Sequence, residues 1–330
     1  MKRFFSADDV TDLNALVNEA LAIKKFPMLN NNLGKGKTLG LVFLNSSLRT
    51  RLSTQKAAQN LGLHTIVLNA GQEAWTWEFE DGAIMNGTTV EHIKDAANVL
   101  SQYCEIIGLR CFAGLTNKEE DTSEKIFSLF EKYASVPVIS LESATLHPLQ
   151  SLADCITIAE HLPYHKKPKV VLTWAPHIKS IPQAVGNSFA QWMNRTDFEF
   201  VITHPKGYEL DTQYTQNATI EHNQQKALQN ADFVYIKNWS SFEEYGKVLH
   251  VDEDWLLTNK KLEVTNNAKI MHCLPVRRNV EVSDAVLDSE NSLIYEQANN
   301  RTFAAQVILE KIIKGNEKVK HHQDWWEHHR

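Results

Sequence analysis

Hydroxyl and guanidinium side chains gather where one amphipathic stretch begins. Residues 45–51 read Asn-Ser-Ser-Leu-Arg-Thr-Arg and directly follow an apolar run. Ser47 can cap the helix predicted here, and the free backbone N–H groups of its first turn favour an anion. Arg49 adds paired donors that match phosphate oxygens. The segment therefore predicts a phosphate cradle, although a capped helix with surface arginines would present the same residues.

Two more apolar runs lead into polar groups. Arg110 ends one of them, and a buried arginine needs either an acidic partner or an anionic ligand. His147 and Gln150 stand at i and i+3 at the start of a helical pattern. An imidazole and an amide placed there can donate to a carbonyl oxygen that gains negative charge. A structural ion pair and a histidine that only caps a turn are the alternatives.

Residues 272–275 read His-Cys-Leu-Pro after the last apolar run. A thiol nucleophile at Cys273 has no candidate base except its neighbour His272. The backbone carbonyls of Cys273 and Leu274 are more informative, because a proline at 275 favours an extended residue before it and leaves these oxygens unpaired. His177, Lys237 and Arg301 stand in similar places, where ordinary loops are the alternative. No catalytic triad, carboxylate pair or metal-ligand spacing stands out, so no metal site is predicted.

The elements that must position these groups alternate along the chain. Strand-length apolar runs cover residues 38–44, 64–68, 105–112, 136–141, 169–174, 198–203, 232–237 and 269–273. Helical patterns cover residues 49–61, 90–103, 122–133, 149–161, 182–193, 220–228 and 302–313. Apolar strands that alternate with helices indicate parallel sheets covered on both faces. The fold class predicted is α/β, with two doubly wound parallel-sheet domains and an interdomain cleft.

The break at 144–148, which includes a proline, predicts domains at residues 1–147 and 148–301. A last helix from residue 302 is free to return to the first domain. Ligands of such sheets bind beyond the carboxyl ends of the strands, where the polar groups described above stand. Together they predict a basic cleft for a small phosphorylated donor. The tail, residues 318–330, holds four histidines and two adjacent tryptophans; we expect a solvated end, with adventitious metal binding as the alternative.

Composition restricts the class of protein. The 330 residues are 43% hydrophobic and 22% charged, which excludes collagen-like and disordered chains. A net charge of −6 gives no global attraction to nucleic acid or to an anionic membrane. No apolar run approaches the roughly 20 residues that a membrane span needs. The four cysteines form no C-x-x-C pair, so we expect reduced thiols and a cytoplasmic protein without nucleic-acid or membrane partners.

Three motifs in order resemble the carbamoyltransferase (transcarbamylase) family. Residues 47–51 are similar to its Ser-x-Arg-Thr-Arg motif, residues 147–150 to its His-Pro-x-Gln motif, and residues 272–275 to the His-Cys-Leu-Pro motif of its ornithine-type branch. Residues 296–301 resemble its Glu-x-x-Asn-Arg element, with one extra residue. The resemblance spans nearly the whole chain. It implies a carbamoyl-phosphate-binding domain, then an amino-acid-binding domain, and a homotrimer with active sites at the subunit interfaces.

The resemblance also implies roles for individual residues, with no metal or organic cofactor. The phosphate would be held by Ser47, the Leu48 backbone, Arg49 and Thr50. The carbamoyl carbonyl would be polarised by Thr50, Arg110, His147 and Gln150. The carbonyl oxygens of Cys273 and Leu274, with Gln150, would orient the carbamoyl amide, and Arg301 would help to hold the donor. Trp75 would reach the donor from a neighbouring subunit.

The acceptor substrate is indicated by a loop in which this sequence differs from the family's ornithine-specific members. The Ser-Met-Gly loop that reads free ornithine is missing, and residues 237–240 read Lys-Asn-Trp-Ser in its place. The chain thus resembles the subgroup that acts on N-acylated ornithine, in which Glu142, His177 and Lys237 line the acceptor pocket. This subgroup also carries a knot, expected here near residues 176–186. Val90, aligned with a glutamate of the acetyl-specific branch, would reach in from a neighbouring subunit.

Charge decides between the two acyl groups. A glutamate at position 90 would repel a dicarboxylic acyl group, whereas Val90 would not, and Arg277 could pair with that group. We therefore expect N-succinyl-L-ornithine as the acceptor. N-acetyl-L-ornithine is the alternative, and a paralogue that binds carbamoyl phosphate without catalysis is a second alternative of another class.

Overall fold

The computed structural model describes residues 1–70, 76–163, 167–249 and 253–327, with side chains described as far as residue 315. The chain divides into two compact units. Unit 1 comprises residues 1–112, 123–143 and 301–330, and unit 2 comprises residues 113–122 and 144–300. The break at 143/144 lies four residues before the expected one at 147/148, and the short segment 113–122 joins the second unit. The expected return of the C-terminal helix to the first unit is confirmed.

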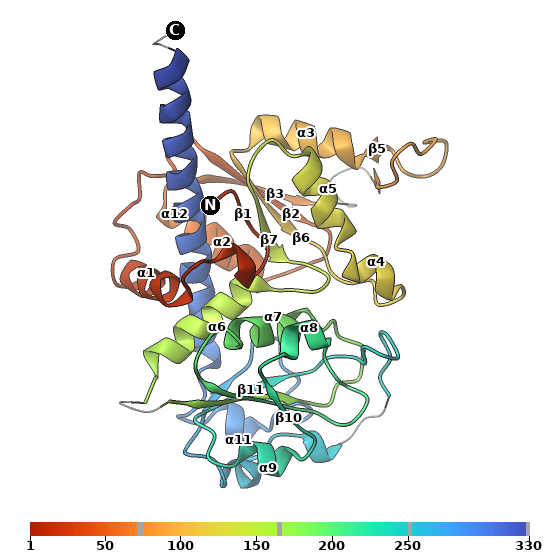
Figure 1. The fold of residues 1–330 in the computed structure, drawn as a ribbon, viewed down its shortest axis with the longest axis vertical. Coiled ribbons are helices and arrows are strands. Elements are labelled where there is room, and N and C mark those ends of the chain that lie inside the picture. The colour runs from red at the N-terminus through yellow and green to blue at the C-terminus, as the bar shows by residue number, and fades with distance from the viewer. Residues whose placement is uncertain (71–75, 164–166, 250–252, 328–330) are drawn as a thin grey trace. The chain divides into compact units, whose positions relative to one another are not determined.

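Unit 1 contains a five-stranded sheet in the order β1-β7-β6-β2-β3, with every pair parallel. Its strands are β1 (Arg3–Phe4), β2 (Thr38–Phe43), β3 (His64–Asn69), β6 (Ile106–Arg110) and β7 (Val138–Glu142). Helices α1 (Leu13–Lys25) and α2 (Arg49–Asn60) lie on one side, and α3 (Ile93–Tyr103) and α5 (Lys125–Tyr133) on the other (Figure 1). Two short strands, β4 (Trp77–Glu78) and β5 (Glu91–His92), pair outside this sheet.

Unit 2 contains a second parallel sheet in the order β10-β9-β8-β11-β12. Its strands are β8 (Lys169–Trp174), β9 (Glu199–Thr203), β10 (Thr219–Glu221), β11 (Phe233–Lys237) and β12 (Lys269–Met271). Helices α6 (Pro148–Glu160), α7 (Ala184–Met193) and α8 (Thr212–Thr215) lie on one face, and α9 (Gln224–Leu228) and α11 (Asp284–Leu287) on the other (Figure 1). Short helices α4 (Lys118–Thr122) and α10 (Asn259–Leu262) complete the unit.

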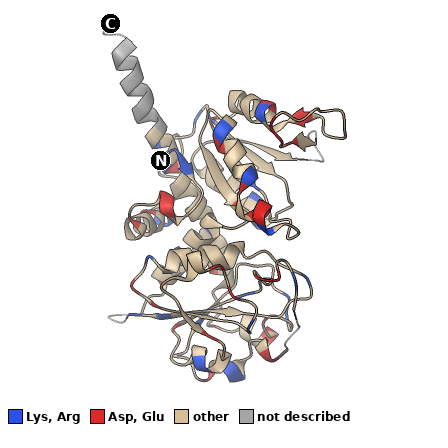
Figure 2. Cartoon of the chain, turned by 45° about the vertical axis from the view of Figure 1, so that its right-hand side comes forward, with Lys and Arg blue, Asp and Glu red and all other residues tan. Residues whose placement is uncertain are grey.

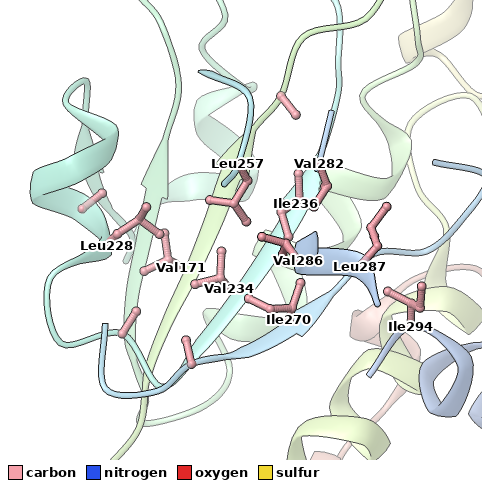
Figure 3. Close-up of a cluster of buried hydrophobic side chains, with 14 of the residues drawn as sticks. Val171, Leu228, Val234, Ile236, Leu257, Ile270, Val282, Val286, Leu287 and Ile294 are labelled. Atoms are coloured by element: carbon pink, nitrogen blue, oxygen red, sulfur yellow. The ribbon is translucent and has the colours of Figure 1, made fainter. Parts of the chain in front are cut away.

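Each sheet packs against its helices through apolar side chains. In unit 2, Val171, Val234 and Ile270 of three neighbouring strands meet Leu228 of α9 and Val286 of α11 (Figure 3). All of these side chains are fully buried, and each contributes about 1.5–3 kcal/mol relative to an exposed position. In Figure 2 the acidic and basic residues are interspersed along the helices, while the strands are largely uncharged. The apolar sheets thus hold the polar strand ends in place.

The α/β class with two doubly wound parallel sheets is confirmed, and so are all eight predicted strands. The helix predicted at residues 220–228 is wrong in its first half. Residues 219–221 instead pair with β9 as edge strand β10. Helix α9 begins only after Asn223, whose side chain caps it by accepting a hydrogen bond from the Lys226 amide. Helix α1 was not predicted. Helix α12 (Ile294–Glu327) begins before residue 302 and continues through most of the segment expected to be a solvated tail.

Within the part of the chain that the structure describes, none of the helices combines the length and apolar composition required to cross a bilayer. The segment at residues 176–186, where a knot is expected, contacts residue 240: Ile181 accepts a hydrogen bond from the Ser240 amide at 2.9 Å, and Gln183 donates to the Ser240 carbonyl at 3.0 Å. Threading of this loop by a later segment stays a prediction.

Candidate functional site

The first turn of α2 follows the carboxyl end of β2 in unit 1. Leu48, directly before α2, already has helical angles (φ −82°, ψ −59°), and its side chain makes no capping hydrogen bond. The Ser47 hydroxyl accepts a hydrogen bond from the Thr50 amide at 3.3 Å, as expected of the residue that caps this helix. The Leu48 side chain is 65% exposed, whereas Thr50 is buried. The remaining N–H groups of this turn favour an anion.

Two guanidinium groups converge on the Thr50 hydroxyl. Arg110 Nη1 donates to Thr50 Oγ1 at 3.0 Å, and Arg301 Nη2 donates to the same oxygen at 2.5 Å. All three side chains are buried. Because Thr50 Oγ1 accepts both bonds, its own O–H is the group that can donate to a further acceptor. The arrangement gathers two cations and one hydroxyl donor at the start of a helix, which is a site for a multiply charged anion.

Arg110 is held from several sides. Its Nη1 lies 2.6 Å from Oε2 of Glu142, and its guanidinium carbon lies 4.3 Å from the centre of the Phe112 ring. Burial lowers the pKa of Arg110, Glu142 raises it, and Arg49 lowers it further; an arginine remains a cation under all these influences. Among the described residues, no acceptor reaches its buried Nε. A ligand oxygen can satisfy that N–H.

In unit 2, His147 takes the N-cap position of α6 ahead of Pro148, and its side chain is buried, as is that of Gln150. The Gln150 NH₂ donates to Asp154 Oδ1 at 2.7 Å, and Gln297 Nε2 donates to the same oxygen at 2.7 Å. The bond to Asp154 uses one N–H and fixes the Gln150 amide, whose NH₂ group has a second N–H and whose carbonyl oxygen is an acceptor. Both expected roles of Gln150, at the carbamoyl carbonyl and at the carbamoyl NH₂, stay predictions.

The turn after β12 differs from the expected extended form. Leu274 has a φ of +57°, in the left-handed region, and its peptide bond to Pro275 is cis. A leucine in that region costs roughly 1–2 kcal/mol, and such residues cluster at functional sites. Its amide donates to Nδ1 of His272 at 2.9 Å. Among the described residues, no hydrogen bond reaches the Leu274 carbonyl oxygen, so this part of the prediction holds.

His272 is fixed by a buried carboxylate that the sequence reading missed. His272 Nε2 lies 3.1 Å from Oε2 of Glu281, and the Arg277 amide donates to Oε1 of Glu281 at 2.9 Å. Burial raises the pKa of Glu281, but the hydrogen bond from His272 and the nearby charge of Lys237 lower it more, so the net shift is downward. Glu281 is therefore ionised and interacts with both His272 and Lys237.

The ends of β8 and β12 meet through two predicted acceptor residues. Arg277 Nε donates to Nε2 of His177 at 3.0 Å. Nδ1 of the same ring accepts a hydrogen bond from the Lys179 amide at 3.0 Å and lies 2.9 Å from the Lys179 carbonyl oxygen, which fixes the ring orientation. Lys237 ends β11 and faces the charge of Glu281. The structure thus brings His177 and Arg277 together and places Lys237 on the adjoining strand.

The other predicted site residues lie in different parts of the two units. Glu142 stands in unit 1 beside Arg110, whereas His177 and Lys237 belong to unit 2. Val90 lies next to β5 and is 59% exposed. Cys273 is buried. Trp75 lies outside the described residues. The signal that could have found Asp154 is an acidic residue within an otherwise apolar helical face, four residues after Gln150.

Comparison with known proteins gives one consistent result. The carbamoyl-P binding domain model of aspartate/ornithine carbamoyltransferases matches residues 2–160, and the Asp/Orn binding domain model matches residues 182–312. An N-succinylornithine carbamoyltransferase of Bacteroides fragilis is 50% identical over 95% of this chain and 99% of its own length. An N-acetylornithine carbamoyltransferase of Xanthomonas campestris is 35% identical over 95% of this chain and 98% of its own.

A solved structure is similar throughout. It is a glutamate-to-valine variant of an N-acetyl-L-ornithine transcarbamylase complexed with carbamyl phosphate and N-succinyl-L-norvaline. The TM-score is 0.89 at 33% identity, covering 94% of this chain and all of that one.

Proposed function

Because the chain belongs to the aspartate/ornithine carbamoyltransferase family, we propose that it transfers the carbamoyl group of carbamoyl phosphate to the side-chain amine of N-succinyl-L-ornithine. The products are N-succinyl-L-citrulline and phosphate. The observation that carries the proposal is the convergence of Arg110 and Arg301 on the Thr50 hydroxyl. Two buried cations at the first turn of a helix match a phosphorylated donor with several negative charges.

The donor is held by residues of unit 1. Ser47, the backbone of Leu48 and Arg49 surround the phosphate at the start of α2. The Thr50 hydroxyl, whose oxygen already accepts from both arginines, donates to the carbamoyl oxygen. Arg110 donates to the same oxygen, and its buried Nε supplies a further N–H. His147 is the further donor that the resemblance to the family implies.

These donors stabilise the reaction's transition state. The uncharged amine attacks the carbamoyl carbon, a C–N bond forms, and the carbonyl oxygen becomes an oxyanion. Each fixed donor aimed at such an oxygen contributes roughly 2.7–4 kcal/mol in comparable acyl-transfer sites. The bond between the carbamoyl carbon and the oxygen that bridges it to phosphorus then breaks. The departing phosphate takes the proton of the amine. The side-chain oxygen of Gln150 and the carbonyl oxygen of Leu274 accept hydrogen bonds from the carbamoyl NH₂ and so fix the orientation of the planar carbamoyl group.

Charge in unit 2 supports a dicarboxylic acceptor. Lys237 pairs with the α-carboxylate of the acceptor, and Arg277, held by His177 at 3.0 Å, pairs with the succinyl carboxylate. Val90 places no negative charge near that group. The similar solved structure binds N-succinyl-L-norvaline in a protein where valine replaces a glutamate, and the relative at 50% identity is named for N-succinylornithine. N-acetyl-L-ornithine remains the alternative acceptor, as in the relative at 35% identity.

We also propose a homotrimer with active sites at the subunit interfaces. Edge strand β3 leaves Ile66 51% exposed, and α2 leaves Leu52 56% exposed. An apolar edge of this kind favours association with another chain. The proposed compartment is the cytoplasm, because the four cysteines are free thiols.

The test is product formation from carbamoyl phosphate with ornithine, N-acetyl-L-ornithine and N-succinyl-L-ornithine in parallel. We expect turnover of the succinyl compound to exceed that of the other two by at least about tenfold in kcat/KM, as about 1.4 kcal/mol of discrimination requires. Turnover of the acetyl compound alone would keep the reaction and overturn the acceptor. A thermal shift with carbamoyl phosphate and no turnover with any acceptor would identify a binding protein without catalysis.

A further inference from the structure

Three side chains with metal-binding chemistry meet at the far edge of the unit 2 sheet. His204 directly follows β9 and His222 directly follows β10, the labelled edge strand in Figure 1. These strands are parallel and pair Thr203 with Glu221, so the two histidines are the next residues in register. Glu209 comes from the loop after β9. One potential ligand atom from each of the three lies within 4.8 Å of the others.

Hydrogen bonds preset both imidazole rings. Nδ1 of His204 lies 2.9 Å from the Pro205 carbonyl oxygen, and Nδ1 of His222 lies 3.0 Å from the His204 carbonyl oxygen. A carbonyl can only accept, so each Nδ1 carries the proton and each Nε2 keeps its lone pair. Histidines that bind metals in proteins are fixed in this way, with the second ring nitrogen donating to a backbone carbonyl.

The surroundings hold the cluster in place without occupying it. His204 is 1% exposed, and its ring stands at 82° to that of His222 with 5.0 Å between ring centres. The loop that carries Glu209 is anchored at Tyr208, whose carbonyl accepts from Trp239 Nε1 at 2.7 Å. Among the described residues, the Glu209 carboxylate makes no hydrogen bond and no ion pair.

We propose that His204, Glu209 and His222 form a binding site for a divalent first-row transition ion, with Zn²⁺ as the occupant. Two imidazole nitrogens and one carboxylate oxygen are a donor set of zinc, whereas Mg²⁺ and Ca²⁺ prefer oxygen alone. Zinc–ligand bonds of about 2.0–2.1 Å put tetrahedral ligand atoms about 3.4 Å apart. The ligand atoms, which now lie within 4.8 Å of one another, therefore need to approach by at most about 1.4 Å to bind zinc. Rotation of the side chains can provide this. Water completes the fourth position.

This site lies apart from the proposed reaction. His177 follows β8, Lys237 ends β11 and His272 follows β12, whereas the two histidines of the cluster follow β9 and β10. Strand β10 has three residues, of which Thr219 and Ile220 are exposed. An ion bound to His204 and His222 joins this short edge strand to its neighbour, so its role is to stabilise the edge of the sheet. The His-rich tail is a second possible metal binder and must be controlled.

The experiment is calorimetric titration of ZnCl₂ into the metal-free, full-length protein with all four tail histidines replaced (His321→Ala, His322→Ala, His328→Ala and His329→Ala). We expect one Zn²⁺ per chain, a raised midpoint of thermal unfolding with zinc, and no binding of MgCl₂. In that background His222→Ala and Glu209→Gln should each weaken zinc binding by at least about tenfold. His64→Ala, an exposed histidine on β3, should bind as the parent does.

Two outcomes would overturn the site. One is absence of zinc binding once the tail histidines are replaced, which would assign all metal binding to the tail. The other is unchanged affinity in both His222→Ala and Glu209→Gln. Co²⁺ provides a second readout: a four-coordinate site gives strong visible absorption, and this absorption should be lost in the same two variants and kept in His64→Ala.

Discussion

Arg110 and Glu142 form a buried ion pair because the register of two parallel strands shifts by one residue between them. Leu109 pairs with Ser140, but Arg110 pairs with Glu142, so Leu141 is the extra residue of a bulge. Paired residues in neighbouring strands point their side chains the same way, and bulges re-aim a side chain at functional sites. The result is a distance of 2.6 Å between Arg110 Nη1 and Glu142 Oε2 at the strand ends, next to Thr50.

The first prediction concerns Arg110. Arg110→Ala should lower kcat/KM by about 100- to 1,000-fold, the loss typical of one oxyanion donor. It should also destabilise unit 1 by about 3–5 kcal/mol, because it leaves Glu142 buried without a counter-charge. The double variant Arg110→Met with Glu142→Gln removes that penalty and should recover the thermal midpoint without recovering activity. Near-full turnover in the double variant would contradict the assigned role.

The second prediction concerns the positioning of Gln150 by Asp154. Asp154→Ala removes the oxygen that accepts from both Gln150 and Gln297, so Gln150 can turn and kcat should fall by about 100-fold. Asp154→Asn keeps a carbonyl oxygen at that place and should retain most activity. Steady-state kinetics with varied carbamoyl phosphate measure both. Equal losses in the two variants would show that charge, and not position, is what Asp154 provides.

The third prediction concerns acceptor choice. Val90→Glu should shift the ratio of kcat/KM from N-succinyl- toward N-acetyl-L-ornithine by about tenfold or more, because a carboxylate repels the succinyl group. Val90 is 59% exposed, so stability should change by less than about 0.5 kcal/mol. Val90→Gln has a similar size without charge and serves as the control. An unchanged ratio in Val90→Glu would rule out a role for this position in specificity.

The fourth prediction concerns pH. The pKa of Glu281 is lower in the folded protein than its ordinary value of 4.5, so the ionised carboxylate stabilises the fold above that value. This contribution is lost as pH falls through the lowered pKa. Glu281→Gln should therefore lower the thermal midpoint at pH 7, through hydrogen bonds worth about 1.5–3 kcal/mol. The difference from the parent should shrink below about pH 4.5; a constant difference would show that Glu281 is not ionised in the fold.

The fifth prediction concerns assembly. Leu52→Lys and Ile66→Lys place charges on the exposed apolar surface of α2 and β3 and should lower the mass measured by light scattering from that of a trimer of 37.6 kDa chains. Activity should fall with it. Ile220→Lys, on exposed strand β10 of unit 2, is the matched control and should remain trimeric. A parent protein that is monomeric at all concentrations would refute the trimer.

The accuracy of the sequence reading varied with the kind of feature. Strand β8 was predicted at its observed residues, because five consecutive buried positions, residues 170–174, leave a nearly unbroken apolar run. Strand β10 was taken for helix, because Thr219 and Ile220 are exposed and leave no apolar run to detect. Helix α1 was overlooked although Leu13, Leu16, Val17 and Ala20 repeat at helical spacing.

The candidate site likewise contains residues that short motifs indicate and partners that only the fold brings to them. Ser47, Arg49, Thr50, His147 and Gln150 stand in short motifs whose types and spacing already indicate an anion and a carbonyl to be polarised. Their partners are distant in the chain: Arg301 is 251 residues from Thr50, and Gln297 is 143 residues from Asp154. Helices and strands follow from the spacing of apolar residues, which can be read directly from the sequence. The partner of a buried polar group depends on strand order, on the bulge at Arg110 and on the path of α12, which arise when the sheets pack.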